Sequence, residues 1–357
     1  MKLAASLEIP YFQFLDPDGQ LSSDAPADLA DPSFLLSYFR KMVACRAFDT
    51  KAIALQRTGK LGTYASSLGH EATHVGMGAF LQDEDCFAPS YREHGTLFER
   101  GVQAREILLY WGGDERGSDF AHARHDFPMC VPISTQMLHA AGVALSYKLR
   151  DMPQVAMSSC GDGGSSKTDF YAAVNSAGAY KLPLVLCIVN NGWAISVPRS
   201  AQTGAGTLAQ KGLAGGLYSA QVDGNDLIAV LYACREAIDR ARRGEGATLL
   251  EFMTYRLHDH TTADDARRYR AAEEVEAAWK VEPFIRLRKY LTANGLWSDE
   301  QEQELIAQTN EWVAAEIDAY LQTPMPPVSA MFDYLYGDMP SEVLEQRELA
   351  MQREGQA

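Results

Sequence analysis

The stretch from residue 155 to residue 196 constrains the fold more than any other part of the chain. It opens with a short apolar run, VAMSSC, which breaks at once into Gly161-Asp162-Gly163-Gly164. A buried strand that ends in a loop has this pattern. A helical pattern follows from Thr168 or Asp169, which can cap a helix of about three turns, and a second apolar run covers residues 184–189. The sequence therefore predicts a strand, a loop, a helix and a second strand.

The predicted crossover through a helix returns the second strand parallel to the first. Asp162 and Asn191 each follow one of these strands, so we expect both at one edge of a sheet. In open parallel sheets the ligand site lies at the carboxyl ends of the strands, where Gly163 and Gly164 let the backbone approach phosphate oxygens. Asp162, Asn191 and the backbone carbonyl of Trp193 offer three oxygens, which suits Mg²⁺ with water and phosphates completing its octahedron. Taken singly, GDGG and NNG are equally typical of ordinary turns in an α/β protein.

Together the two motifs are more specific. A Gly-Asp-Gly separated by 26 residues from Asn-Asn, each after an apolar run, resembles the signature of thiamine-diphosphate enzymes. The surrounding sequence resembles the alpha subunit of the decarboxylating component of 2-oxo acid dehydrogenases, of the pyruvate and branched-chain types. The resemblance covers nearly the whole chain and rests on the motifs GKLGTYASSLGHEATHVG, SYREHG, PISTQMLHAAGVAL, NNGWAIS, VDGNDLIAV and TYRLHDHTTADDARRYR. It implies a thiamine-diphosphate-binding α/β fold, a mostly parallel sheet flanked by helices, with a helical C-terminal region.

The resemblance also implies roles for individual residues. Tyr91 and Arg92 would reach the diphosphate, and a guanidinium suits that task because it can bond two phosphate oxygens. His260 would contact the same group, and His94 would lie near the cofactor, so both are candidate catalytic residues. Val131 and Ile133 match positions that line the two cofactor rings, with Ile133 as the apolar wedge. Thr261 stands where mitochondrial relatives carry a phosphorylated Ser, which puts kinase regulation in doubt.

Composition excludes several classes of protein. The chain has 357 residues, 46% of them hydrophobic, and a net charge of −15, which argues against binding nucleic acid. Its six cysteines form no CxxC pair and are expected to be reduced. The longest apolar run, residues 182–189, is too short to span a bilayer, and the N-terminus does not read as a signal peptide. We therefore expect a cytoplasmic protein without a membrane contact.

Periodicity divides the chain into three parts. Residues 1–32 form a Pro- and Asp-rich arm with a hairpin-like FQFLDPDGQL, expected to pack on a partner. Residues 33–272 form the diphosphate- and magnesium-binding domain, and residues 273–357 form a helical region packed on it. The clearest further elements are helices over 34–58, 137–149, 299–321 and 341–354, a helix capped by Asp226 that runs to Arg242, and a strand over 248–253 that delivers the polar run 255–270 to the same sheet edge.

Two histidine patterns offer a rival interpretation. His70-Glu71-Ala72-Thr73-His74 matches the HExxH motif of zinc peptidases, with Glu71 placed as general base. The extended motif would need a third ligand three or six residues after His74, where Met77 and Phe80 stand. His122 and His125 could also ligate a metal, although a solvated loop explains them better.

The resemblance predicts what the chain does and what it lacks. We find no second unit like a pyrimidine-binding domain with an activating glutamate, so a beta subunit is expected to complete the site, in an α2β2 heterotetramer. The expected reaction is decarboxylation of a 2-oxo acid and transfer of the acyl group to a lipoyl group on an acyltransferase core. Ala65 aligns with a His of mitochondrial pyruvate-type relatives, whereas branched-chain and several bacterial relatives have a nonpolar residue there. This favours branched-chain 2-oxo acids, with pyruvate as a competing or shared substrate. The alternatives are an acetoin dehydrogenase alpha subunit and a non-catalytic assembly subunit.

Overall fold

The computed structural model describes residues 6–354. A six-stranded sheet lies at its centre, with every neighbouring pair parallel and the order β1-β7-β8-β4-β3-β2. The strands are β1 (Tyr11–Phe12), β2 (Cys86–Ala88), β3 (Ala156–Gly161), β4 (Leu184–Asn190), β7 (Tyr218–Asp223) and β8 (Thr248–Met253). A separate antiparallel ribbon joins β5 (Trp193–Ala194) to β6 (Val197–Pro198). The predicted α/β class and parallel sheet are confirmed.

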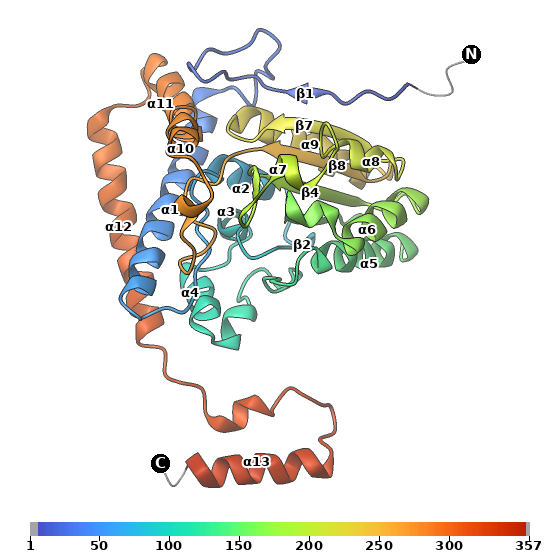
Figure 1. Ribbon diagram of the computed structural model, residues 1–357, viewed down its shortest axis with the longest axis vertical. Coiled ribbons are helices and arrows are strands. Elements are labelled where there is room, and N and C mark those ends of the chain that lie inside the picture. The colour runs from blue at the N-terminus through green and yellow to red at the C-terminus, as the bar shows by residue number, and fades with distance from the viewer. Residues whose placement is uncertain (1–5, 355–357) are drawn as a thin grey trace.

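Helices cover both faces of this sheet (Figure 1). Side chains alternate along the strands, so that Val185 and Cys187 enter one core with α1, α2, α4 and α9, whereas Leu184 and Leu186 enter a second core with α5 and α6. The longer helices are α1 (Pro32–Arg57), α2 (Glu71–Gly78), α4 (Ala104–Gly112), α5 (Thr135–Leu149), α6 (Thr168–Ala179) and α9 (Leu227–Arg242). The shorter turns are α3 (His94–Glu99), α7 (Arg199–Gln202), α8 (Gln210–Leu213) and the 3₁₀ segments η1 (Glu115–Ser118), η2 (Gly163–Ser166), η3 (Ala266–Arg268) and η4 (Val328–Met331).

The C-terminal region is helical, as predicted. It contains α10 (Ala272–Trp279), α11 (Pro283–Ala293), α12 (Asp299–Leu321) and α13 (Ser341–Glu354). Helix α12 runs alongside α1 and also packs on α4, whereas α13 lies apart from the rest of the chain at the end of an extended segment (Figure 1). The division into an arm, a binding domain and a helical region remains a prediction.

One local expectation is corrected. Lys167 takes the N-cap position of α6 and gives no side-chain hydrogen bond, so Thr168 and Asp169 lie inside the first turn. The N-terminal arm contacts its own chain, because β1 pairs with β7 and the buried Asp226 carboxylate accepts hydrogen bonds from the backbone N–H of Phe14 and Leu15 at 2.5 and 2.8 Å. Packing of the arm on a partner stays a prediction. Asp226 also caps α9, as predicted, through the N–H of Ile228.

Candidate active site

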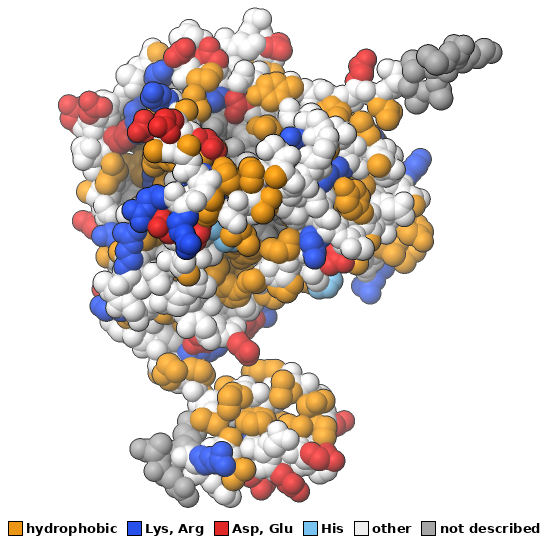
Figure 2. All heavy atoms as spheres, viewed as in Figure 1, with side chains coloured by type: hydrophobic (Ala, Val, Ile, Leu, Met, Phe, Trp, Pro, Cys, Tyr) orange, Lys and Arg blue, Asp and Glu red, His pale blue; other side chains and the backbone are white. Residues whose placement is uncertain are grey.

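A cavity of about 490 Å³ opens at the carboxyl edge of β3 and β4. The register places Gly161 of β3 beside Val189 of β4, so the two loops that follow these strands begin side by side. Most predicted site residues line this cavity: Tyr91, Arg92, Ile133, Asp162, Gly163, Gly164, Asn191, Trp193 and His260. Hydrophobic side chains gather near the middle of the face shown in Figure 2. Ile133 and Ile195 line the cavity and are 44% and 55% exposed.

The Asp162 carboxylate is buried in the cavity wall and is incompletely satisfied. Its Oδ2 atom has no hydrogen-bond partner among the described residues. Burial raises the pKa of Asp162 to about 6, and Arg256 and Arg199 oppose part of this rise. A buried carboxylate oxygen without a hydrogen-bond donor destabilises the fold unless a ligand supplies a donor or a positive charge. The position therefore suits a cation.

Two further oxygens accompany Asp162. The Asn191 amide oxygen accepts one hydrogen bond from the N–H of Trp193 at 3.2 Å, and the Trp193 carbonyl accepts one long bond from Arg256 Nη1 at 3.4 Å. A carboxylate, an amide and a carbonyl are the hard oxygen ligands that Mg²⁺ takes, with water and phosphate filling its octahedron. No group of three His, Cys, Asp or Glu side chains in residues 6–354 could hold a metal by itself. A metal ion at this position would therefore need other ligands beside Asp162, such as the Asn191 amide, the Trp193 carbonyl, water and phosphate.

Gly163 and Gly164 are required by packing within the chain. A Cβ on Gly163 would lie 2.6 Å from Cβ of Ala194, and one on Gly164 would lie 2.7 Å from Oγ of Ser134. The two glycines thus let the loop after β3 pack between the β5–β6 ribbon and the start of α5. The sequence had suggested their role towards phosphate alone.

Two buried arginines lie at the cavity: Arg92 is part of its lining, and Arg256 lies behind the lining, in contact with Trp193 and His260. Arg92 is buried and donates to the carbonyl of Ser66 and, from Nη2, to the carbonyl of His260 at 2.9 Å. Arg256 is fully buried and donates from Nη2 to the carbonyl of Ile195 at 2.9 Å and to the Tyr269 hydroxyl at 2.8 Å. Neither guanidinium pairs with a carboxylate in the part of the chain that the structure describes. Two buried arginines so placed favour a multiply charged anion.

His260 lies between these arginines. Its Nδ1 atom is 3.3 Å from Arg92 Nη2 and 3.3 Å from Arg256 Nη1, and its backbone N–H donates to Asp264 at 2.9 Å. Burial, Arg92 and Arg256 lower the pKa of His260 to about 3. The imidazole is therefore neutral near pH 7, and Nδ1 accepts from the arginines while Nε2 carries the proton.

Arg256 is the residue that the sequence did not single out. It was only one of several arginines in the polar run after β8. The available signal was its position three residues beyond the end of a buried strand, at the sheet edge where Asp162 and Asn191 were already expected. A loop arginine that becomes fully buried needs the tertiary structure to reveal it.

Two predicted site residues do not line the cavity. His94 is fully buried, with Nδ1 3.1 Å from the Tyr64 hydroxyl and Nε2 accepting from the Trp111 indole N–H at 3.3 Å. Burial and Arg92 lower the pKa of His94 to about 3. Val131 is 51% exposed and lies outside the cavity lining. Both ring nitrogens of His94 are thus occupied within the chain.

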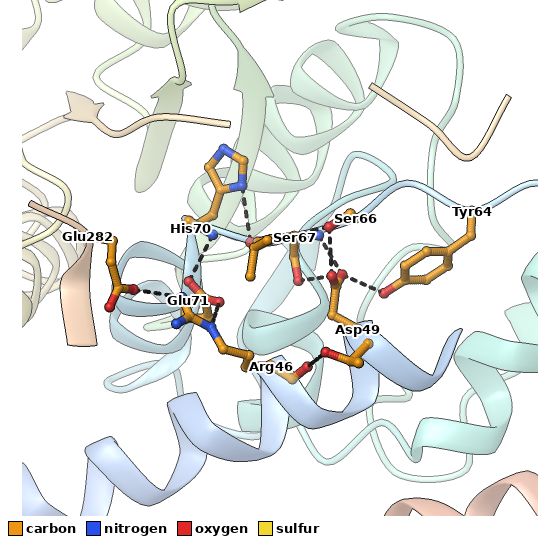
Figure 3. A network of polar contacts seen from close by, with 11 residues as sticks. Arg46, Asp49, Tyr64, Ser66, Ser67, His70, Glu71 and Glu282 are labelled. Carbon is orange, nitrogen blue, oxygen red and sulfur yellow. Dashed lines mark hydrogen bonds and ion pairs between the residues drawn. The ribbon is translucent and has the colours of Figure 1, made fainter. Parts of the chain in front are cut away.

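The HExxH motif does not form a zinc site with Glu71 as its base. His70 and His74 are buried with their rings stacked, 5.3 Å between centroids. The Glu71 carboxylate turns to Arg46, whose Nε atom is 2.7 Å away (Figure 3). A third ligand is missing, as it is around His122 and His125, since no group of three suitable side chains occurs in residues 6–354. His74 instead forms part of the cavity lining, and neither of its ring nitrogens has a partner in that range.

Comparison with known proteins assigns the chain to a family. A sequence model described as "Dehydrogenase E1 component" matches residues 39–329. The chain belongs to this family. It is 40% identical to the pyruvate dehydrogenase E1 component subunit alpha of Staphylococcus aureus (strain Mu50 / ATCC 700699) and 39% identical to that of Staphylococcus epidermidis (strain ATCC 35984 / RP62A), in each case over 96% of this chain and 93% of the relative.

Membership of the E1 family confirms the resemblance drawn from the motifs. The chain is an alpha subunit of the thiamine-diphosphate-dependent 2-oxo acid dehydrogenases, and the expected fold class is confirmed with it. An alpha subunit implies a beta subunit and an acyltransferase core. Separately, no helix within residues 6–354 is both long and apolar enough to cross a membrane.

Proposed function

We propose that this E1 alpha subunit holds the diphosphate and Mg²⁺ half of thiamine diphosphate in the cavity at β3 and β4. The observation that carries the proposal is a set of opposite charges at one cavity: within residues 6–354, the buried Arg92 and Arg256 have no carboxylate partner and the buried Asp162 has an oxygen without a donor. A magnesium diphosphate would supply both missing partners. Asp162, Asn191 and the Trp193 carbonyl would hold the metal, Arg92, His260 and Tyr91 would hold phosphate oxygens, and Arg256 would add positive charge from behind His260 and Trp193.

The remaining residues would orient the cofactor. Bound thiamine diphosphate supplies the carbanion chemistry, and the protein supplies binding and geometry. Ile133 stands at the lip of the cavity, where an apolar side chain can support the bent form of the two rings. His260 is neutral, so it would donate a hydrogen bond from Nε2 and would not add charge to the diphosphate site. Catalytic roles for His260 and His94 remain predictions.

A beta subunit would complete the site, in an α2β2 heterotetramer. Half-exposed apolar side chains at the cavity lip support this, because a partner surface that covers Ile133 and Ile195 removes their apolar area from water. The expected test is titration of thiamine diphosphate with Mg²⁺ into the chain with and without its beta partner. Tight binding that needs both Mg²⁺ and the partner supports the proposal. Binding indifferent to Mg²⁺ would instead indicate a non-catalytic assembly subunit.

The substrate is proposed to be a small 2-oxo acid, decarboxylated and passed as an acyl group to a lipoyl group on the acyltransferase core. Pyruvate is supported by the names of the relatives. Branched-chain acids are supported only by Ala65, which is fully buried and does not line the cavity of this chain. The test compares kcat/KM for pyruvate, 3-methyl-2-oxobutanoate, 4-methyl-2-oxopentanoate and acetoin with the reconstituted enzyme. A preference for pyruvate beyond about a hundredfold would exclude the branched-chain assignment, since one methylene in a pocket is worth only about 1–3 kcal/mol.

A further inference from the structure

Asp49 is a buried carboxylate in the middle of α1, and no cation within residues 6–354 pairs with it. It is 2% exposed and accepts four hydrogen bonds from that part of the chain, all from neutral groups of one short segment. The donors are the Tyr64 hydroxyl at 2.9 Å, the Ser66 hydroxyl at 2.6 Å, and the Ser67 N–H and hydroxyl at 2.6 and 3.2 Å (Figure 3). Three of these donors converge on Oδ1 and the Ser66 hydroxyl bonds Oδ2, so the segment has one preferred position on α1.

This segment, residues 64–69, supports both cationic elements of the cavity. The Ser66 carbonyl accepts from Arg92 Nη1. The backbone of Tyr64 exchanges two hydrogen bonds with Thr262, one to the Thr262 hydroxyl at 3.1 Å and one from its N–H at 2.9 Å. The Leu68 carbonyl accepts from the N–H of Leu257 at 3.2 Å. Arg92 and the loop that carries Arg256 and His260 therefore rest on the same few residues.

The far end of the segment is fixed in a similar way. The N–H of Gly69 donates to Glu71 at 3.0 Å, and Glu71 is held by Arg46, which also pairs with Glu282 at 2.7 Å (Figure 3). Gly69 has φ +94°, and a Cβ there would lie 2.3 Å from the carbonyl oxygen of Tyr255. The segment and the loop after β8 are thus in close contact, and a shift of one moves the other.

We propose that Asp49 is a positioning residue for the diphosphate site: from α1, outside the cavity, it sets residues 64–69, and through them the guanidinium of Arg92 and the 255–270 loop. The inference rests on the proposed function, since it names the anion site as what is positioned. Asp49 does not line the cavity and touches no ligand there. Its effect is therefore expected in the affinity for the diphosphate and not in the chemical step.

The test uses Asp49→Asn in the alpha subunit reconstituted with its beta partner. An amide keeps the size of the carboxylate but replaces one oxygen with an NH₂ group, so at least one of the four hydrogen bonds is lost and the negative charge that strengthens the others is removed. We expect the Kd of thiamine diphosphate at saturating Mg²⁺ to rise about 10–100-fold, the range for residues that orient a ligand. The inhibition constant of inorganic pyrophosphate should rise by a similar factor. The kcat at saturating cofactor should stay close to that of the unmodified enzyme.

A matched control separates positioning from loss of stability. Asp226 is likewise fully buried and accepts only from neutral N–H groups, but it fixes the N-terminal arm and the start of α9. Asp226→Asn should lower the unfolding temperature by a similar amount and leave both affinities unchanged. Equal losses of affinity in the two variants would assign the effect of Asp49 to general destabilisation and overturn the proposal.

If Asp49→Asn does not fold, two milder variants test the same positioning role. Ser66→Ala removes one donor to Asp49 but keeps the carbonyl that holds Arg92, and Thr262→Ala removes the hydroxyl that accepts from Tyr64. Each should raise the Kd of thiamine diphosphate several-fold at unchanged kcat. Normal affinity in both would refute the positioning role. If the unmodified enzyme itself fails to bind thiamine diphosphate with Mg²⁺, the proposed function falls instead.

Discussion

Two buried polar regions lie next to each other in this subunit and are satisfied in opposite ways. Around Asp49, four donors answer one carboxylate, and nearby Arg46 pairs with both Glu71 and Glu282. At the cavity, Arg92 in the lining and Arg256 behind it have only neutral acceptors within residues 6–354, and Asp162 has an oxygen without a donor in the same range. In the first region the chain's own groups satisfy the buried carboxylates, whereas in the second the buried charges lack partners that a ligand could provide.

This difference predicts how substitutions will behave. Removing a group from the region around Asp49 and Arg46 leaves buried partners without hydrogen bonds and lowers the stability of the fold. Removing a group from the cavity wall takes away a desolvated charge, so it should cost binding far more than stability.

The largest effect is expected at the metal end. Asp162→Ala or Asn191→Ala removes a ligand oxygen and should lower the affinity for thiamine diphosphate with Mg²⁺ more than about 100-fold, because even residues behind metal ligands are worth about 10–100-fold. Activity should be abolished while the chain unfolds at nearly the same temperature without cofactor. Isothermal titration beside thermal unfolding gives both readings. Unchanged affinity would remove Asp162 and Asn191 from the metal site.

A smaller loss is expected at the residue that the sequence missed. Arg256→Met should weaken the binding of thiamine diphosphate about 10–100-fold, because it removes a buried positive charge that holds both His260 and the Trp193 carbonyl, and hydrogen bonds to charged groups are worth about 1.5–3 kcal/mol. Its free energy of unfolding without cofactor should change by less than about 1 kcal/mol, because relief of desolvation offsets the lost bonds to Ile195 and Tyr269. Chemical denaturation measures the second quantity. A large loss of stability with normal affinity for the cofactor would show that Arg256 stabilises the fold and does not contribute to binding.

The pH dependence follows from Asp162, whose pKa is raised to about 6 by burial. A metal needs the carboxylate, so cofactor affinity should rise about tenfold between pH 5 and pH 7 and then level off. The free energy of unfolding without cofactor has the opposite pH dependence, because Asp162 and Asp226 bind their protons more tightly in the folded chain than in the unfolded chain. Their contribution to stability is therefore full below about pH 4 and is lost as the pH rises through about 6. Affinity titrations at fixed Mg²⁺ test this. A flat profile between pH 5 and pH 7 would contradict it.

The smallest effect is expected for His260→Ala, which removes one of several contacts to the diphosphate. We expect a loss of at most about tenfold in affinity for thiamine diphosphate, the value of a single net hydrogen bond of about 1 kcal/mol or slightly more. Because the pKa of His260 is lowered to about 3, the variant should keep the pH step assigned to Asp162. Loss of that step in the variant would show that the imidazole titrates in this range.

The sequence by itself determined the elements that carry the metal site. Continuous apolar runs ending in Gly-Asp-Gly and Asn-Asn predicted β3 and β4 within one residue at each end, and the run 248–253 predicted β8. Since parallel strands end at one edge, the proximity of Asp162 and Asn191 followed from local pattern and chain geometry. Family membership also followed from the sequence, because each motif is a short contiguous stretch of residues.

The tertiary structure alone decided which polar residues face the cavity and which support it. Asp49 on α1, Ser66 before α2, Arg92 before α3 and Thr262 after β8 come from four separate parts of the chain and meet only after the sheet and helices pack. The fold also places His94 in contact with Tyr64 and Trp111, and its expected position near the cofactor stays a prediction. The burial of a polar side chain and the count of its partners depend on contacts distant in sequence, and no local pattern encodes them.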